Sequence, residues 1–296
     1  MCKVGFVGLG IMGAPMSGNL MKDGYSVMVF NRSRVPMEAA AADGAEMADS
    51  LAHLASECGI IFTMLPNSPQ VKEVILGEGG LASAAKPGTL FIDMTSGAPG
   101  DSKEIYAALK EKELHIIDAP VSGGEPMAIA GTLAIMTGGD KEAFEQVKPL
   151  LECMGHPVYT GGAGSGSVTK LVNNIVAGAY MVVIAEAYAF AAKAGIDLQT
   201  TFEATRGGFA GGPVYDNKVP KLIHRDYEPG ARVAVHRKDI LNAKHFAHHM
   251  GVDTPMTDVV LMVMDWMNDN GHINEDQIAM VKYYEDKMDV TVGEEK

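Results

Sequence analysis

Three polar side chains on an otherwise apolar stretch carry the strongest sign of chemistry in this chain. Lys170, Asn173 and Asn174 stand at positions i, i+3 and i+4 of the apolar run 168–194, so a helix there would present them on one face. An ammonium group can transfer a proton, and an amide can orient a hydroxyl or a carboxylate through its donor and its acceptor. One interpretation is a polar cluster that faces a cleft. The other is a helix N-terminus whose polar residues face solvent.

A second chemical signal is a glycine-rich turn near the start of the chain. The apolar run 4–7 is typical of a short buried strand, and the turn that follows it precedes a segment with helical spacing. Its residues are Gly8, Leu9, Gly10, Ile11, Met12 and Gly13. Gly8 permits a tight turn, Gly10 lets the backbone approach a pyrophosphate, and Gly13 lets the helix pack close to the strand. The diphosphate would lie on the N–H groups that open the helix, so the turn predicts a dinucleotide site.

The residues after the second predicted strand bear on which dinucleotide binds. Folds that bind NAD place an acidic residue there, about twenty residues beyond the glycines, to accept hydrogen bonds from the ribose. This chain has Asn31, Arg32 and Ser33 instead. Arg32 can pair with a 2′-phosphate, Asn31 and Ser33 can donate to it, and no carboxylate repels it. The pattern favours NADP(H), and NAD(H) stays possible if Arg32 is only a solvated loop residue.

Short polar segments follow three further predicted strands. They are Met64-Leu65-Pro66-Asn67, Asp93-Met94-Thr95-Ser96, and the stretch from Asp118 to Gly124 that contains Ser122 and Gly123. In open α/β sheets, ligands bind outside the carboxyl ends of the strands. We therefore expect these segments to lie near the glycine-rich turn.

The elements that position these residues form two patterns. Apolar runs of strand length at 25–30, 60–64, 90–93 and 116–119 alternate with helical patterns such as 38–42, 71–76 and 102–112, and 133–137 and 158–160 add further strand candidates. The alternation predicts βαβ units in an α/β fold, a Rossmann doubly wound parallel sheet with helices on both faces. After the glycine-rich segment 161–166 the apolar runs become long and helical, at 168–194, 198–205, 238–250, 257–268 and 276–289. We predict a dinucleotide-binding domain over 1–162 and an all-α domain for substrate and oligomer contacts over 163–296.

Composition limits the partners of the protein. The chain has 296 residues, of which 47% are hydrophobic and 21% charged, as in an ordinary globular protein. A net charge of −13 without any basic run argues against nucleic-acid binding. The most apolar long segment, 171–194, contains Asn173, Asn174, Glu186 and Lys193, which predicts a buried helix rather than a membrane span.

Three cysteines lie far apart, at Cys2, Cys58 and Cys153, and are interpreted as reduced thiols of a cytoplasmic protein. The N-terminus runs directly into a strand and leaves no room for a signal peptide. The histidines of 245–249 are expected on an exposed helix face, and we predict no metal site.

Two C-terminal segments allow two interpretations each. The apolar run 259–264 and Trp266 predict a homo-oligomer, a dimer or a tetramer, with ordinary core packing as the alternative. The glycine-rich segment 207–213 is either a mobile flap over a substrate or a connection between helices that needs unusual backbone angles.

Taken together, these motifs resemble the β-hydroxyacid dehydrogenase family over essentially the whole chain. The resemblance rests on five ordered motifs: the glycine turn with Ala14-Pro15-Met16 after it, the 118–124 stretch, Gly131-Thr132-Leu133, the Lys170 helix, and Lys238-Asp239-Ile240. It implies reversible hydride transfer between NADP(H) and C3 of a short 3-hydroxy or 3-oxo carboxylate, without a metal. The implied residues are Lys170 as general acid/base; Ser122, Gly123, Gly124, Asn173 and Asn174 on the substrate; and Leu65, Pro66, Thr95 and Lys238 on the cofactor.

Several segments resemble the branch of that family that reduces tartronate semialdehyde to glycerate. They are 64–69, 71–74, 122–126 and 206–208. Ala231 departs from the pattern, since relatives often carry an aromatic residue there, and so does Asn31, where that branch has an acid. Other short substrates remain open: 3-hydroxyisobutyrate, succinic semialdehyde and 2-(hydroxymethyl)glutarate. An imine reductase is disfavoured by Lys170, and a dinucleotide sensor without catalysis is disfavoured by the intact site set. Asp239 can alternatively pair with a neighbouring lysine in a structural role.

Overall fold

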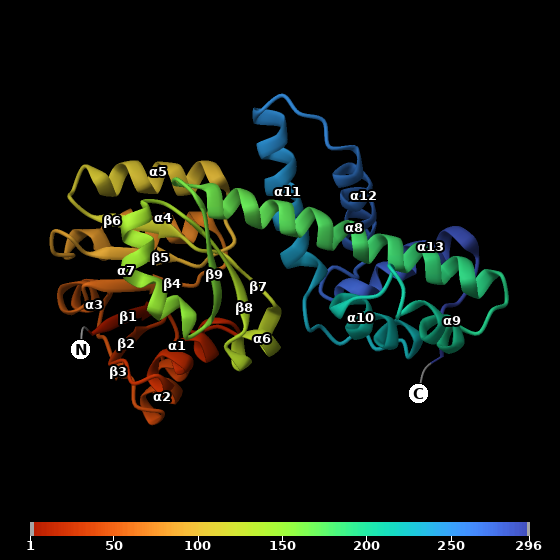
Figure 1. Cartoon of the computed structure of the whole chain (residues 1–296), viewed down its shortest axis with the longest axis horizontal. Coiled ribbons are helices and arrows are strands. Elements are labelled where there is room, and N and C mark those ends of the chain that lie inside the picture. The colour runs from red at the N-terminus through yellow and green to blue at the C-terminus, as the bar shows by residue number, and fades with distance from the viewer. Residues whose placement is uncertain (1–2, 295–296) are drawn as a thin grey trace. The chain divides into compact units, whose positions relative to one another are not determined.

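The computed structural model describes residues 3–294 and divides the chain into two compact units, residues 1–171 and 172–296 (Figure 1). Cys2 lies outside the described residues. The division by packing falls inside the long helix α8 (Ser165–Lys193), whereas composition places the change at residue 163. Helix α8 thus contributes its first turns to the first unit and the rest of its length to the second.

The first unit is built on one nine-stranded sheet. Its strands are β1 (Val4–Val7), β2 (Val27–Phe30), β3 (Glu46–Met47), β4 (Ile60–Thr63), β5 (Leu90–Asp93), β6 (His115–Asp118), β7 (Val121–Ser122), β8 (Leu133–Gly138) and β9 (Gly155–Gly161). They run in the order β3-β2-β1-β4-β5-β6-β8-β7, with β9 paired to β8. Strands β1 to β6 pair in parallel, and β8 is antiparallel to β6 and β7. The predicted Rossmann doubly wound architecture is confirmed.

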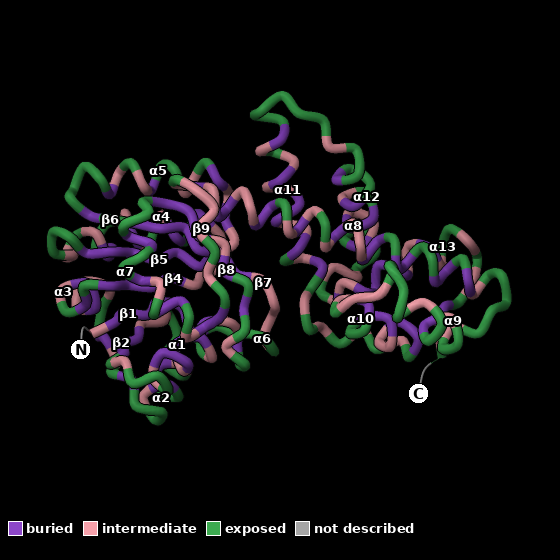
Figure 2. The backbone as a smooth tube through the Cα atoms, viewed as in Figure 1, coloured by how far each residue is buried: buried purple, intermediate pink, exposed green. Residues whose placement is uncertain are grey.

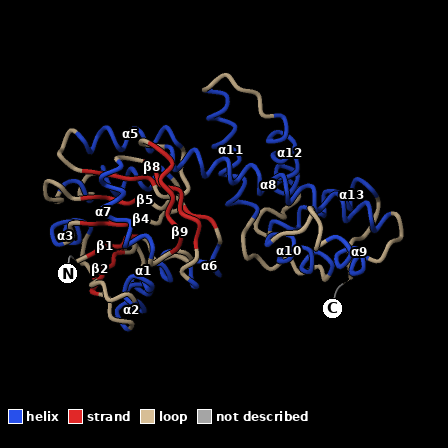
Figure 3. Tube along the Cα trace, in the orientation of Figure 1, coloured by secondary structure: helices blue, strands red, loops and turns tan. Residues whose placement is uncertain are grey.

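Helices cover both faces of this sheet, as Figure 3 shows. They are α1 (Gly13–Lys22), α2 (Arg34–Ala42), α3 (Leu51–Glu57), α4 (Ser68–Leu76), α5 (Pro99–Lys110), α6 (Gly124–Ala130) and α7 (Lys141–Glu152), with a short 3₁₀ turn at Leu81–Ser83. The side chains of alternate strand residues pack into two separate hydrophobic cores. Phe62 packs in the core that holds α1 and α7, whereas its neighbour Ile61 packs with α3, α4 and α5. The central strands are therefore buried on both faces, which explains their continuous apolar runs (Figure 2).

The described part of the second unit is helical apart from one isolated bridge. Its further helices are α9 (Leu198–Thr205), α10 (Pro213–Ile223), α11 (Val233–His249), α12 (Pro255–Asp269) and α13 (Val281–Met288), with a 3₁₀ turn at Gln277–Met280. Helix α8 has the length and apolar composition of a membrane span. Met181, Ile184 and Tyr188 on α8 nevertheless lie in the core of this unit, where Val260 and Val263 of α12 also pack.

Some boundaries differ from the sequence-based expectations. The segment expected as a single helix over 276–289 is a 3₁₀ turn followed by α13, and the Asp276 carboxylate caps the start of the turn by accepting the Ile278 N–H at 3.1 Å. Helix α10 was not expected, because it opens on a proline after four glycines and carries Pro220 inside. Strand β2 begins at Val27 rather than residue 25.

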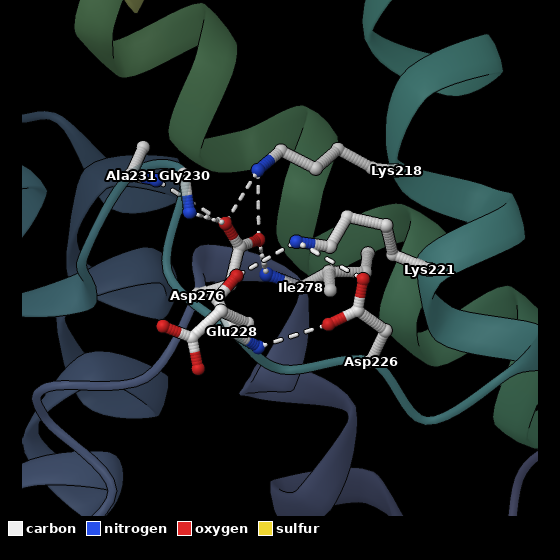
Figure 4. Close-up of polar contacts among 8 residues, drawn as sticks. All are labelled: Lys218, Lys221, Asp226, Glu228, Gly230, Ala231, Asp276 and Ile278. Carbon is white, nitrogen blue, oxygen red and sulfur yellow. Dashed lines mark hydrogen bonds and ion pairs between the residues drawn. The ribbon is translucent and has the colours of Figure 1, made fainter. Parts of the chain in front are cut away.

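A buried ion pair in the second unit holds the chain that leads into α11 (Figure 4). Lys218 Nζ donates to both carboxylate oxygens of Asp276, at 2.7 and 2.8 Å. Asp276 Oδ2 also accepts the backbone N–H groups of Gly230 and Ala231, at 3.0 and 3.2 Å. The Asp276 side chain is fully buried. One carboxylate thus ties α10, the 230–231 segment and the 3₁₀ turn together.

Replacing Asp276 with alanine tests this dependence. Asp276→Ala leaves the Lys218 ammonium buried without its partner, so we expect a loss of about 3–5 kcal/mol in the free energy of unfolding, measured by urea denaturation. The control is Lys244→Met, which breaks the more exposed pair of Lys244 and Asp258 (2.7 Å) and should cost no more than about 1 kcal/mol. Equal costs for the two variants would contradict the role given to Asp276.

Candidate functional site

The glycine-rich turn has the backbone geometry that its sequence predicts. Gly8 has a φ of +99°, and a Cβ there would lie 2.2 Å from the carbonyl oxygen of Met64. At Gly13 a Cβ would lie 1.9 Å from the carbonyl oxygen of Gly8. Around Gly10, by contrast, no atom lies within 4 Å of the Cβ position. The first and third glycines are therefore needed for packing inside the chain, while the second leaves space above the backbone.

The start of α1 suits an anion. Within the described chain no side chain caps this helix, and its first turn carries no acidic residue. Strand β1 lies between β2 and β4, so the connections after β1 and β4 leave in opposite directions and open a crevice at their carboxyl ends. The open space at Gly10 lies at this place. These residues fit the diphosphate of a dinucleotide, which would accept the N–H groups at the helix start.

Asn31 ties the end of β2 to the glycine turn. Its Oδ1 accepts the Leu9 N–H at 3.1 Å, and its Nδ2 donates to the carbonyl oxygen and the hydroxyl of Ser33, at 3.1 and 2.9 Å. Because these bonds use both amide hydrogens, donation from Asn31 to a phosphate would require one of them to break. Arg32 and Ser33 are exposed. Arg32 therefore presents an exposed cation just after the end of β2.

A buried carboxylate joins the ends of β4 and β5. Asp93 Oδ1 accepts the Thr63 hydroxyl at 2.9 Å and the Thr95 N–H at 3.1 Å, and the Thr95 hydroxyl accepts the Leu65 N–H at 3.0 Å. Burial raises the pKa of Asp93 from its usual 3.8 to about 6, although the hydrogen bonds from Thr95 and Thr63 lower it. The structure thus brings together Leu65, the exposed Pro66 that follows it, and Thr95.

A second buried carboxylate, on the neighbouring strand, meets the start of α8. Asp118 Oδ1 accepts the Gly164 N–H at 2.8 Å and Asp118 Oδ2 accepts the Ser167 N–H at 2.7 Å. Burial raises the pKa of the Asp118 carboxyl, and these two backbone bonds lower it. Lys170 lies one turn further along α8 and is 9% exposed. The sequence places Asp118 at a strand end but does not show that it contacts the lysine helix.

Ser122, Gly123 and Gly124 lie where β7 passes into α6. Gly123 and Gly124 have φ values of +143° and +66°, a conformation that other residues rarely adopt. Gly123 is the residue that precedes α6, and all three are half-buried. The Ser122 hydroxyl and the backbone N–H groups of such a turn can accommodate a carboxylate.

In the second unit, Asp239 connects the polar residues expected from sequence. Asn173 Nδ2 donates to Asn174 Oδ1 at 2.9 Å, and Asn174 Nδ2 donates to Asp239 Oδ2 at 2.8 Å. Lys238 Nζ lies 3.1 Å from Asp239 Oδ1, which confirms the pairing with a neighbouring lysine. The interpretation that Asn173 and Asn174 simply face solvent is wrong for Asn174, which is buried in this network.

His236 is a buried member of this network that the sequence analysis missed. Its Nε2 lies 2.9 Å from the carbonyl oxygen of Asn174, and because a carbonyl only accepts, Nε2 carries the proton. His236 precedes Asp239 by three residues, so the helical spacing was a signal that could have found it.

Two further features singled out in the sequence are the histidines of 245–249 and Ala231. His245, His248 and His249 are exposed, and residues 3–294 contain no group of three or more metal-binding side chains close together. Ala231 is half-buried, and its N–H contacts Asp276 as described above.

The glycine-rich connection between α9 and α10 does not need unusual backbone angles. Gly207, Gly208 and Gly211 have no positive φ, and Gly212, with a φ of 162° and a ψ of 174°, is extended. A Cβ at Gly211 would instead lie 1.7 Å from the carbonyl oxygen of Arg206, so close packing requires that glycine. The Tyr180 hydroxyl donates to the carbonyl of Ala210 in this segment. The backbone-angle interpretation is therefore wrong.

Comparison with known proteins places this geometry in a family. A family model described as the NAD binding domain of 6-phosphogluconate dehydrogenase matches residues 3–162, and one described as NAD-binding of NADP-dependent 3-hydroxyisobutyrate dehydrogenase matches residues 164–284. The chain is 36% identical to the 2-hydroxy-3-oxopropionate reductase of Escherichia coli over 284 residues, which cover 96% of this chain and 97% of that one.

Two further relatives are named after other substrates. The 2-(hydroxymethyl)glutarate dehydrogenase of Eubacterium barkeri is 35% identical over 293 residues, covering 98% of this chain and 97% of that one. The solved structure of Mycobacterium tuberculosis 3-hydroxyisobutyrate dehydrogenase with L-serine has a TM-score of 0.87 and 31% identity, covering 96% of this chain and 99% of that one. The names of these relatives agree on the reaction class and differ in substrate.

The pKa of Asp93 predicts how stability changes with pH. A carboxyl group whose pKa rises on folding binds more protons in the folded state, so it weakens the fold as the pH rises from about 4 to about 6. Asp93→Asn keeps the Oδ1 acceptor and removes the titration. We expect the unfolding free energy of the variant, relative to the parent chain, to rise by about 3 kcal/mol between those pH values, measured by urea denaturation.

The control for this experiment is Asp197→Asn. Hydrogen bonds from Thr200 lower the pKa of Asp197, so the carboxylate contributes stability that is lost as the pH falls. The Asp197→Asn difference should therefore fall with rising pH. A pH-independent difference for Asp93→Asn would contradict the assignment of Asp93.

Proposed function

The chain belongs to the 3-hydroxyisobutyrate dehydrogenase family of NAD(P)-dependent hydroxyacid dehydrogenases, and we propose that it transfers a hydride between NADP(H) and C3 of a short 3-hydroxy or 3-oxo carboxylate. The observation that carries this proposal is a buried Lys170 on the same face of α8 as Asn174, whose amide is held by Asp239. A lysine can supply the proton that a carbonyl reduction needs, and an oriented amide can position the substrate.

The proposed mechanism assigns each group one task. When bound, the nicotinamide supplies or accepts the hydride. In the reducing direction Lys170 gives a proton to the substrate oxygen, and its positive charge stabilises the negative charge that develops there. Ser122, Gly123 and Gly124 hold the substrate carboxylate. Asn173 and Asn174 orient the substrate, and their chain of hydrogen bonds to Asp239 fixes which way the Asn174 amide points.

The cofactor side of the proposal uses the residues that the sequence motifs predict. Gly8 to Gly13 bind the diphosphate, and Leu65, Pro66 and Thr95 contact the dinucleotide, as does Lys238 from α11. We propose NADP(H) as the preferred form, because Arg32 is exposed at the end of β2 and no acid follows that strand. We propose residue 163 as the functional boundary. One family match ends at 162 and the other starts at 164, which supports this boundary.

The substrate that we propose is tartronate semialdehyde, reduced to glycerate. Two observations support it: the 36% identity to a 2-hydroxy-3-oxopropionate reductase over nearly the full length, and the segments 64–69 and 122–126. A specific finding also favours 3-hydroxyisobutyrate as a second candidate, namely the solved relative with that name at a TM-score of 0.87.

We propose a cytoplasmic homo-oligomer, and exposed apolar side chains support the oligomer. Val172, Val176, Val183 and Phe190 repeat along one side of α8 and are 52–67% exposed, and Met262 on α12 is 49% exposed. Val260, Val263 and Met264 of the same apolar run are buried, so core packing explains only part of it. We expect a dimer or a tetramer in sedimentation at micromolar concentration, and a monomer would contradict this proposal.

A spectrophotometric assay tests the substrate and the cofactor together. NADPH and NADH are each oxidised in the presence of tartronate semialdehyde, methylmalonate semialdehyde and succinic semialdehyde, and kcat/KM is compared. We expect the highest value for NADPH with tartronate semialdehyde. Equal or better values with NADH would contradict the role of Arg32, and a higher value for another aldehyde would replace the substrate.

Replacing Lys170 tests the proposed acid. General acid catalysis contributes about 10²–10⁴-fold, so Lys170→Ala should lower kcat by at least that order while the dissociation constant of NADPH stays nearly unchanged. Lys193→Ala, an exposed lysine at the other end of the same helix, serves as the control and should keep kcat. A near-normal kcat for Lys170→Ala would remove Lys170 from the mechanism.

A further inference from the structure

We propose that Asp118 is a positioning residue for Lys170: its carboxylate caps α8 from another part of the fold and fixes where the lysine lies. This inference rests on the proposed role of Lys170 as the acid. All the contacts that carry it lie within the first unit, from strand β6 to the first turns of α8.

Helix α8 cannot cap itself. It begins at Ser165, so the preceding residue is Gly164, which has a φ of +84° and no side chain. The N–H of the third helical residue is the donor that a capping side chain normally takes. Here that donor is Ser167 N–H, and Asp118 Oδ2 accepts it at 2.7 Å. The other carboxylate oxygen accepts the Gly164 N–H at 2.8 Å, so Asp118 supplies the cap that the glycine lacks.

Asp118 is itself held rigidly. It ends β6, where it pairs with Asp93 of β5 on one side and with Gly138 of β8 on the other. The side chain is buried. A carboxylate that accepts two N–H groups at a helix N-terminus makes strong hydrogen bonds and meets the positive end of the helix dipole. The sheet therefore dictates the position of the first turn of α8.

Close backbone contact gives a second, independent sign of this attachment. A Cβ at Gly166 would lie 2.4 Å from the carbonyl oxygen of Met136 and 2.5 Å from that of Asp118. A Cβ at Gly138 would lie 2.6 Å from the Gly166 nitrogen. The backbone of the helix start therefore lies directly against β6 and β8 at Gly166 and Gly138, and the Asp118 carboxylate adds two hydrogen bonds to this contact.

The position of the helix start determines where Lys170 lies, one helical turn further along α8. It follows Ser167 by three residues, so it stands next to Ser167 on the same side of α8. Loss of the Asp118 cap would let residues 165–168 fray and would move the base of the Lys170 side chain. A displacement of about 1 Å at a reacting group can cost on the order of 100-fold in rate.

The test is a double-mutant cycle on kcat with NADPH and tartronate semialdehyde, or with the aldehyde that proves best in the panel. Asp118→Asn keeps the size of the side chain but replaces one acceptor oxygen with an amide donor. We expect kcat to fall about 10- to 100-fold in the parent chain and less than twofold in the Lys170→Ala background. The KM for NADPH should change less than twofold, because the two N–H groups that Asp118 accepts belong to Gly164 and Ser167, neither of which is proposed to contact the cofactor.

Each outcome decides a different claim. If Asp118→Asn lowers kcat equally in both backgrounds, its effect does not pass through Lys170 and the inference is wrong; an unchanged kcat in the parent chain also overturns it. If Lys170→Ala alone keeps kcat, the proposed function fails instead. Asp197→Asn is the matched control, because Asp197 caps α9 through Thr200 at 2.7 Å and should leave kcat unchanged.

A second variant keeps the inference testable if Asp118→Asn does not fold. Gly166→Ala retains the carboxylate but forces the helix start away from the carbonyls of Met136 and Asp118. We expect a loss of kcat that again depends on Lys170, with an unchanged KM for NADPH. An unchanged kcat for a folded Gly166→Ala variant overturns the inference.

Discussion

The two hydrogen bonds that Asp118 accepts from Gly164 and Ser167 join the sheet to the helix that carries the proposed acid. Their physical basis is simple: a buried helix N-terminus leaves N–H donors without partners, and a buried carboxylate needs donors. Each group removes the cost of burying the other. The contact is possible only because glycines stand at 138 and 166, where any side chain would hold the helix away from the strands.

Buried carboxylates recur as organising groups throughout the described chain. The buried acids of residues 3–294 are Asp93, Asp118, Asp239 and Asp276. Asp93 holds the loops after β4 and β5, and Asp118 holds α8. Asp239 orients Asn174, and Asp276 fixes the segment before α11. In each case the acid joins segments that are distant in sequence. The segments that Asp93, Asp118 and Asp239 join also carry residues proposed to meet cofactor or substrate.

The features of the fold that depend on local sequence patterns could be predicted from the sequence. The alternation of apolar strands and helices predicts the sheet, and the spacing of Gly8, Gly10 and Gly13 predicts a turn whose conformation the structure has. Lys170 and Asn174 were placed on one helix face because helical spacing is a local property. Helix α10 was missed because proline and glycine at its start are local signals for a loop.

The polar contacts between distant segments were beyond such reasoning. Gly164 follows Asp118 by 46 residues, and nothing in either segment specifies the other. A carboxylate at the end of an apolar strand and a helix that starts on glycine are both visible in the sequence, but their pairing depends on the sheet order. Asn31 is a similar case: its type suggested contact with a phosphate, while its bonds to Leu9 and Ser33 use its amide within the chain.

Hydrogen–deuterium exchange of the first turn of α8 shows whether Asp118 holds that turn in place. In the parent chain the Ser167 amide should exchange slowly, and in Asp118→Asn residues 164–170 should lose protection while β1 to β5 keep theirs. Unchanged protection of the Ser167 amide in that variant would contradict the claim.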